Sequence, residues 1–151
     1  MKTVLFAMLA LSASMTAADV DIYSPSELQA MTGKLSQKQA PFSSQALSKY
    51  GTTHYTMLAH REATGSSEVH EKEADVFVIT SGSATLLYGG KLVKPHTEKP
   101  GELRGTSISG GEKQKVEQGA IIHIPAGVPH QLVLEKGQPI TYFVVKVIES
   151  K

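Results

Sequence analysis

A helical period of apolar side chains is found in residues 25–37. Apolar residues recur there every three to four positions, which places them on one face of an α-helix. These residues are Leu28, Met31 and Leu35. Ser24 is a typical N-cap, Pro25 suits the first helical position, and Glu27 stands where a capping box requires an acidic side chain. The pattern predicts a single helix over residues 25–37.

From residue 53 onward, the pattern changes to the two-residue alternation of β-strands, with many β-branched and aromatic residues. The four clearest segments are THYTMLAHRE (53–62), ADVFVITSGSATLLYGG (74–90), GAIIHIPAG (119–127) and ITYFVVKVIES (140–150). Gly82 interrupts the second segment, and other glycines mark turns between the segments. Many short strands at close spacing predict an all-β sandwich or barrel.

Two segments lack a clear period. Residues 39–52 (QAPFSSQALSKYGT) are mostly polar, and we expect them to form a connection between the helix and the strands. Residues 91–111 contain two prolines and four glycines. This second segment is too long for a hairpin turn, so we expect an ordered loop over one end of a barrel.

The first 18 residues have the pattern of a secretory signal peptide. Lys2 precedes an apolar run over residues 4–11, and small residues continue to Ala18. The run is shorter than a membrane-spanning helix requires, and we expect cleavage after Ala17 or Ala18. An uncleaved anchor or a buried N-terminal helix is the alternative. The expected organisation is a signal peptide (1–18), a helix with its connection (19–52) and a barrel (53–151), in a periplasmic or secreted protein.

Charge and cysteine content argue against several classes of function. The chain has 15 Lys and Arg residues against 14 Asp and Glu residues, and Lys2 is the one charged residue of the expected signal peptide. The mature chain would therefore have a formal charge of zero, which argues against nucleic acid or an anionic membrane as a partner. There is no cysteine, so neither a disulfide nor a thiolate nucleophile or metal ligand is available.

A motif near the end of the chain resembles the second conserved motif of the cupin family of small β-barrels. That motif consists of a glycine, five residues, Pro-x-Gly, two residues, a histidine, three residues and an asparagine. In this chain the matching residues are Gly119, Pro125, Gly127 and His130, and Leu134 stands in place of the asparagine.

An earlier segment resembles the first cupin motif. His70 matches its second histidine, Asp75 stands in place of its glutamate, and Gly82 matches its closing glycine. Glu68 stands where the family has its first histidine. The resemblance covers about residues 53–147. It implies an all-β, double-stranded β-helix (cupin, or jelly-roll) barrel, preceded here by one short N-terminal helix.

The spacing of the residues also predicts that several histidine and carboxylate side chains lie close together. Glu68 and His70 are two residues apart on an extended segment, so their side chains point to the same face. Asp75 opens the next strand, and His130 follows a corner whose prolines restrict the backbone. In a small barrel, all four side chains could converge on the interior. Two imidazoles with one or two carboxylates bind Fe(II), and the same donors suit Mn, Zn, Ni or Cu, so we expect one divalent transition metal.

Each of these residues also has a simpler interpretation. His130 could lie on a surface turn, and His70 belongs to a charged run, HEKEAD, that could be a solvated hairpin. Asp75 could be a turn residue bonded to its own backbone. Glu68 could be a surface carboxylate, or a pocket acid that does not touch the metal. The presence of both motifs favours the metal site.

Two further histidines are candidates for supporting roles. His123 lies in an apolar strand, which favours a core position or a contact behind the metal ligands over a ligand role. His54 and His60 share one face of their strand, and they would line the cavity if that face is the inner one. His60 and Glu68 are the acid–base candidates, because a pocket imidazole or a carboxylate that does not bind the metal can carry a proton.

The resemblance implies a protein that binds or converts a small molecule. Cupins include dioxygenases, isomerases and lyases as well as proteins that only bind a ligand, so the fold alone does not name the reaction. We favour a metal-dependent enzyme. The alternatives are a non-catalytic periplasmic carrier or sensor, and a barrel whose interior polar residues only bond to one another. Cupin barrels often pair through their sheets, so a monomer and a homodimer both stay open.

Overall fold

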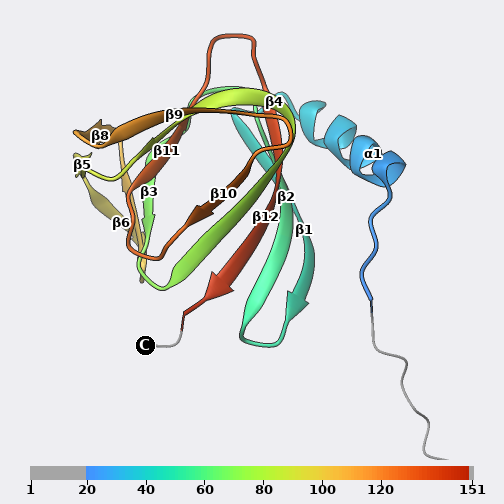
Figure 1. Ribbon diagram of the computed structural model, residues 1–151, viewed down its shortest axis with the longest axis horizontal. Coiled ribbons are helices and arrows are strands. Elements are labelled where there is room, and N and C mark those ends of the chain that lie inside the picture. Colours follow the sequence, from blue (N-terminus) through green and yellow to red (C-terminus); the bar gives the residue numbers. More distant parts are fainter. Residues whose placement is uncertain (1–19, 150–151) are drawn as a thin grey trace, which may run out of the picture.

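Strands make up most of the structure, a computed structural model that describes residues 20–149. They curl into a barrel-shaped antiparallel arrangement, with the one helix of the described residues beside it (Figure 1). The elements are α1 (Pro25–Ser36), β1 (Phe42–Tyr50), β2 (His54–Arg61), β3 (Ser67–His70), β4 (Glu73–Tyr88), β5 (Lys91–Val93), β6 (His96–Lys99), β7 (Glu102–Gly105), β8 (Ser107–Ser109), β9 (Glu112–Glu117), β10 (Ile121–Ile124), β11 (His130–Val133) and β12 (Ile140–Ile148). The predicted all-β class with one short helix is confirmed. The expected signal peptide lies outside the described residues.

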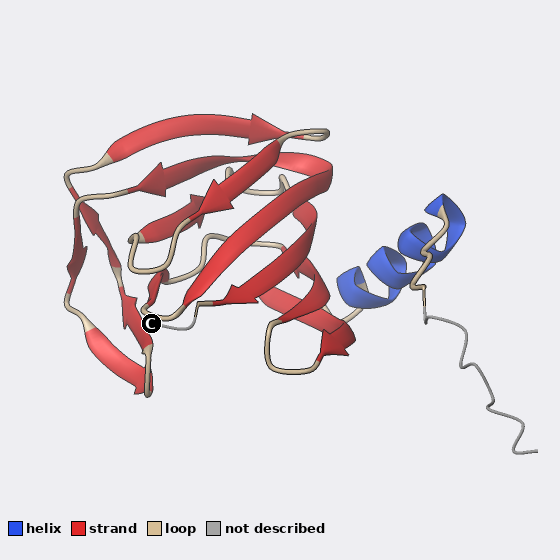
Figure 2. Cartoon of the chain, turned by 60° about the horizontal axis from the view of Figure 1, so that its bottom comes forward, coloured by secondary structure: helices blue, strands red, loops and turns tan. Residues whose placement is uncertain are grey.

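The predicted helix is present as α1. Its capping box forms as expected: the Glu27 N–H donates to Ser24 Oγ at 3.3 Å, and the Ser24 N–H donates to the Glu27 carboxylate at 2.8 Å. Leu35 is 2% exposed and anchors the helix, which contacts β1 and β2. Figure 2 shows that the helix lies outside the barrel, at one side of it. No helix between residues 20 and 149 is both long and apolar enough to cross a membrane.

Residues 42–50, expected to be part of a polar connection, instead form strand β1. This strand pairs antiparallel with β2 and lies at one edge of the large sheet. Ser43 is its one buried residue, and the Ser43 hydroxyl donates to the Leu35 carbonyl at 3.0 Å. A strand with a single buried side chain has no apolar alternation, which is why the sequence pattern does not reveal it.

Strand β4 links the two halves of the barrel. Residues 73–82 of this strand pair with β12, and the part after them pairs with β9 and β11. Gly82 lies where the partners change and has a φ of +79°, a conformation that residues with a side chain rarely adopt. A Cβ at this position would overlap the carbonyl oxygen of Pro139. The interruption predicted at Gly82 is therefore a bend within one continuous strand.

Residues 91–111 contain four short strands, β5 to β8, in place of the expected loop. Strand β7 pairs with β3 on one side and with β6 on the other, while β5 pairs with β8. Each strand has three or four residues, too few to show an alternation in the sequence. The pairing of β7 with β3 has a functional consequence, because it brings Glu102 and Arg104 next to the strand that carries Glu68 and His70.

The apolar core lies inside the barrel and forms one wall of an adjoining pocket. The core residues that also line this pocket are Ala59, Phe77, Tyr142 and Val144. Other core residues include Ile79, Leu86, Ile124, Leu132 and Ile140. Side chains at this wall are therefore held by packing within the barrel.

Candidate metal centre

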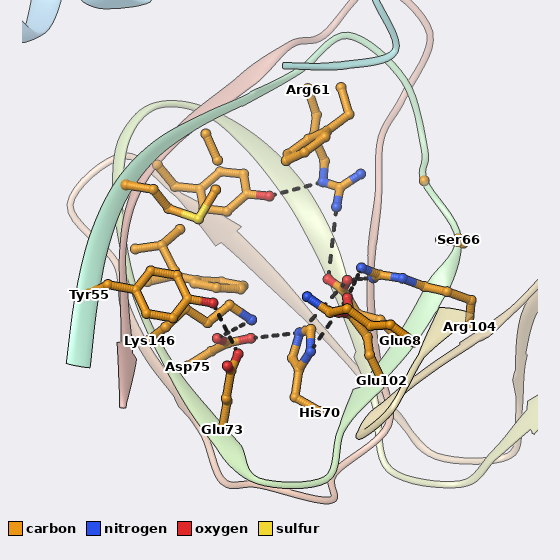
Figure 3. Close-up of a pocket in the computed structure, with 18 residues that line it drawn as sticks. Tyr55, Arg61, Ser66, Glu68, His70, Glu73, Asp75, Glu102, Arg104 and Lys146 are labelled. Carbon is orange, nitrogen blue, oxygen red and sulfur yellow. Dashed lines mark hydrogen bonds and ion pairs between the residues drawn. The ribbon is translucent and has the colours of Figure 1, made fainter. Parts of the chain in front are cut away.

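The barrel holds a pocket of about 430 Å³, in which polar side chains from several strands point toward one another (Figure 3). Its volume is within the range of sites for small molecules. The walls come mainly from β2, β3, β4, β7 and β12. Their lining is rich in ionisable groups, with four cationic and four acidic side chains: Arg61, Lys99, Arg104 and Lys146, and Glu68, Glu73, Asp75 and Glu102.

The structure brings Glu68, His70, Asp75 and His130 together beside this pocket. His70 Nε2 and His130 Nε2 each lie 3.4 Å from Asp75 Oδ2. His130 Nε2 lies 3.4 Å from Glu68 Oε1, and His70 Nε2 lies 3.8 Å from Glu68 Oε2. The four side chains are between 1% and 14% exposed. Two imidazole nitrogens and two carboxylates thus face one point in a largely buried site.

The corner that precedes His130 is hydrogen-bonded to the strand that carries His70. Gly127 adopts a φ of +82°, and its N–H donates to the His70 carbonyl at 2.7 Å. His130 then begins β11, where it pairs across the sheet with Glu68 of β3. The corner and the strand register together hold His130 beside both residues of the earlier motif.

The imidazole nitrogens that face the centre of this group have no hydrogen-bond partner among residues 20–149. They are His70 Nε2 and His130 Nε2, and both atoms are buried. The other ring nitrogen of His130, Nδ1, lies 3.0 Å from the Val128 carbonyl. Because a carbonyl can only accept, Nδ1 carries the proton and Nε2 of the neutral ring keeps its lone pair. Buried polar atoms without partners are rare, and a cation bound between these two nitrogens would account for both.

Burial is the main reason that the His70 imidazole is neutral at physiological pH. Burial lowers the pKa of His70 to about 4, and the positive charge of Lys146 adds to this effect while Asp75 opposes it. Burial alone would raise the pKa of Asp75, but the positive charge and hydrogen bond of Lys146 oppose this effect, and the pKa is lowered. A neutral imidazole and an ionised carboxylate are the forms that bind metals.

The separations in this group fit a divalent transition metal. Two ligands bound at about 2.1 Å from one ion lie about 3.0–3.5 Å apart at tetrahedral or octahedral angles. Three of the separations above are 3.4 Å. Glu68, His70 and His130 each offer a donor atom within 4.8 Å of the others, and Asp75 lies within 3.4 Å of both imidazoles. The donors suit Fe(II), Mn, Zn, Ni or Cu(II).

Lys146 is a residue of this site that the sequence analysis missed. It lies opposite Asp75 across β12 and β4, with its ammonium nitrogen 2.6 Å from Asp75 Oδ1. Burial lowers the pKa of Lys146, and the charge of Asp75 opposes this shift. A signal was present in the sequence: Lys146 is the one charged residue in the apolar run ITYFVVKVI, and it shares the parity of the pocket-lining Tyr142 and Val144.

Glu102 and Arg104 of β7 are two more missed residues, and they form the polar wall behind His70. The strand register places Arg104 opposite Glu68 and Glu102 opposite His70. Arg104 forms ion pairs with both Glu68 and Glu102, and Glu102 Oε1 lies 3.8 Å from His70 Nδ1. This distance is longer than a hydrogen bond, so Glu102 contributes a negative charge near the outer nitrogen of the ring without bonding to it. Neither residue was predicted from the sequence, because their segment was expected to be a loop.

His60 and His123 lie outside this pocket. His60 is buried on the opposite face of β2, with Nδ1 2.8 Å from Thr141 Oγ1 and Nε2 2.8 Å from Glu62 Oε1. The odd-numbered residues of β2 line the pocket instead. His123 is exposed on β10 along an outer groove, and not in the core. Of the two acid–base candidates, Glu68 borders the pocket and His60 does not.

Comparison with known proteins identifies the fold. No family model and no curated protein matches the chain. The Cnp3 cupin domain of Schizosaccharomyces pombe superposes with a TM-score of 0.55 at 8% identity, over 74% of this chain and 67% of that chain. The polyketide cyclase RemF from Streptomyces resistomycificus gives 0.50 at 20% identity (72% and 66%), and the Streptomyces nucleoside dehydratase Pac13 gives 0.52 at 5% identity (74% and 72%). The chain therefore has the cupin fold that the two motifs implied.

Proposed function

We propose that this protein is a metal-dependent cupin enzyme that acts on a small molecule in the barrel pocket. One divalent transition metal would be held by His70 and His130 together with Glu68, Asp75 or both. The observation that carries this proposal is the pair of buried imidazole nitrogens without partners, which face two carboxylates at 3.4–3.8 Å. Export through a signal peptide of residues 1–18 is part of the proposal and is supported by the sequence pattern.

In this proposal, the residues around the centre have separate roles in metal binding, proton transfer and substrate binding. A bound metal would act as a Lewis acid or bind water or O₂ in an open coordination position. Asp75 is 1% exposed and Glu68 is 14% exposed, so Glu68 is the more accessible of these two carboxylates to a substrate in the pocket. We assign Glu68 the role of proton acceptor when it is not a ligand. The apolar wall that includes Phe77 and Val144 would limit the access of water to the side of the substrate that lies against it.

Two of the structurally similar proteins support an enzymatic role. RemF is a polyketide cyclase and Pac13 is a nucleoside dehydratase, so barrels with this fold carry out reactions on small organic molecules. For this chain we favour an isomerase or lyase type of reaction. The identity of the metal separates the types, because iron with an open position would favour a dioxygenase.

A metal-free ligand-binding barrel is the second candidate, and the charges of the pocket favour it. The four cationic and four acidic lining residues cancel formally without any ion. Lys146 lies 2.6 Å from Asp75, and Arg104 pairs with Glu68, so both potential carboxylate ligands already have partners. In this case the protein would be a carrier or sensor without turnover.

Metal analysis of the exported protein distinguishes the two candidates. The full chain is expressed without a tag in a host supplied with mixed transition metals, and it is purified from the periplasm without chelator. Mass spectrometry tests removal of residues 1–18, and elemental analysis gives the metal content. We expect about one equivalent of a single transition metal per chain, because three or four protein ligands define one site. Zinc titration of the chelator-treated protein should restore the same stoichiometry.

The variant His123→Ala is the matched control for this measurement. It removes an imidazole that is exposed on β10, away from the pocket, so the metal content should not change. Metal bound in the wild type and lost in this variant would place the site on the outer surface. No metal in the purified protein and no binding on titration would favour the metal-free barrel.

Replacing Lys146 with methionine is expected to raise the affinity for zinc about tenfold, because its ammonium repels a cation bound to the same carboxylate. The ammonium nitrogen lies 2.6 Å from Asp75 Oδ1, and methionine keeps much of the side-chain length without the charge. Isothermal titration of zinc into both chelator-treated proteins measures the change. An unchanged or weaker affinity would indicate that Asp75 is not a ligand.

A further inference from the structure

Arg61 presents its guanidinium to the pocket in a fixed orientation. Its Nε donates to the Tyr142 hydroxyl at 2.9 Å, and its Cζ lies 4.6 Å from the centre of the Phe42 ring. Gly65 leaves room for the guanidinium, because a Cβ at Gly65 would overlap Nη1. The strand register explains one of these contacts, since Phe42 of β1 lies opposite Arg61 of β2. Arg61 is 12% exposed, and Figure 3 shows it at one end of the pocket.

Arg61 differs from the other three cationic residues of the pocket in its pairing. Lys146 and Lys99 have carboxylate oxygens at 2.6 Å and 2.9 Å, and Arg104 pairs with two carboxylates. The closest carboxylate to Arg61 among residues 20–149 is Glu68, with 3.8 Å between Arg61 Nη2 and Glu68 Oε1. This distance is longer than a hydrogen bond. The guanidinium of Arg61 is therefore oriented by its neighbours, and its outer nitrogens make no hydrogen bond to a carboxylate of residues 20–149.

The pocket has two binding groups close together, the Arg61 guanidinium and the metal centre. Glu68 Oε1 lies 3.8 Å from Arg61 Nη2 and 3.4 Å from His130 Nε2, so a few ångströms separate the guanidinium from the metal ligands. The lining residues carry equal numbers of positive and negative charges, and a divalent ion would add two positive charges. The loaded pocket therefore favours an anion. The remaining wall, which includes Met57, Phe77 and Val144, is apolar.

We propose that Arg61 binds the carboxylate of the substrate, and that the substrate is a small carboxylic acid with an apolar body. A guanidinium forms two parallel hydrogen bonds with a carboxylate, a geometry that an ammonium does not match. The apolar body would lie against Phe77 and Val144, and the reacting group would reach the metal. This inference rests on the proposed function, because it places the carboxylate beside a metal-loaded centre.

Fluorine NMR with a matched pair of probes tests the proposal on the zinc-loaded full chain. The probes are 4-fluorobenzoate and 4-fluorobenzamide, which have the same ring and differ in charge. We expect 4-fluorobenzoate to bind at least about tenfold more tightly than the amide, as for other buried charge-assisted pairs. Arg61→Gln should remove this preference and weaken 4-fluorobenzoate about tenfold. Arg61→Lys should recover part of the loss, because it restores the charge without the planar fork.

Two controls separate Arg61 from the general charge of the pocket and from the fold. Lys99→Gln removes a cation that is 65% exposed and lines the same pocket, and it should retain the preference for 4-fluorobenzoate. Zinc should bind Arg61→Gln at least as tightly as the wild type, because Arg61 Nη2 lies 3.8 Å from Glu68 Oε1 and its loss removes a positive charge near the centre. Such a result shows that the centre is intact. Equal 4-fluorobenzoate affinity in Arg61→Gln and wild type, or no binding to the wild type, would overturn the proposal.

Zinc binding tests the proposed function, and the preference for the carboxylate probe tests the role of Arg61. Failure to bind zinc contradicts the proposed function, and the two probes are then compared on chelator-treated protein. Loss of the carboxylate preference in Arg61→Gln would still support Arg61 as the anion site under those conditions. Binding of 4-fluorobenzoate that needs zinc and does not depend on Arg61 would mean that the metal takes the carboxylate. That outcome overturns the inference and leaves the metal site standing.

Discussion

Replacing His130 with alanine is expected to lower the affinity for zinc at least about a hundredfold, because the loss of even an indirect contact to a ligand costs 10- to 100-fold in other metal sites. His130 offers a buried Nε2 with no hydrogen-bond partner among the described residues, 3.4 Å from oxygens of both Glu68 and Asp75. Its Nδ1 is fixed by the Val128 carbonyl, so no other atom of the ring can take over. Isothermal titration and elemental analysis measure the loss.

A second variant keeps this test independent of folding. His130 is buried, and alanine leaves a cavity that should cost about 2 kcal/mol of unfolding free energy. His130→Gln fills more of that space and still lacks the imidazole, so it should show the same loss of zinc with a smaller loss of stability. Urea unfolding of the chelator-treated proteins checks the fold. Wild-type zinc affinity in either variant would exclude His130 as a ligand, and with it the role assigned to the corner at Gly127.

The sequence predicted the features that depend only on residues close together in the chain. The capping box at Ser24 and Glu27 depends on residues three positions apart, and it forms as expected. Glu68 and His70 share a face because strand geometry alternates every residue, whatever the strand pairs with. The Pro-x-Gly corner ends at His130 because Gly127 takes the positive φ that this turn requires. The positions of these residues follow from local backbone geometry, which can be predicted from neighbouring residues in the sequence.

The residues that were not predicted reach the site through the pairing register of distant strands. The hydrophobic pattern of the sequence does not specify this register. Lys146 meets Asp75 only because β12 pairs with β4 at that position. Arg104 meets Glu68 through the pairing of β7 with β3, and β7 itself was not predicted. His60 shows the same limit in another form. Alternation predicts which residues of β2 share a face, but it does not say which face is turned inward, and the odd-numbered residues are the ones that line the pocket.

The bend in β4 is a third feature that depends on distant contacts. A glycine within a strand pattern indicates a bulge or a close approach of another backbone, and the sequence does not say which. At Gly82 the structure shows a close approach, because Pro139 lies against its Cα. Pro139 is followed by Ile140, which is fully buried and pairs with Gly82 and with Arg61. The backbone at Pro139 therefore has little freedom to move away.

Replacing Gly82 with alanine is accordingly expected to lower the free energy of unfolding by about 3 kcal/mol or more, because a positive φ and an overlap with a packed backbone act together. The control is Gly137→Ala in the turn before β12. Gly137 has a φ of +75°, and a Cβ there would meet no atom within 4 Å. It should cost about 1–2 kcal/mol, the cost of the backbone conformation alone.

Urea unfolding of the two variants separates backbone strain from steric overlap. If Gly82→Ala costs no more than Gly137→Ala, the approach of Pro139 is not a constraint on the bend. A larger cost should also weaken zinc binding, because β4 carries Asp75 before the bend and pairs with His130 after it. Gly137→Ala should leave zinc affinity unchanged, since Gly137 lies outside the pocket. Stability and metal affinity would then fall together at Gly82 alone, as expected if the bend sets the distance between the two halves of the metal centre.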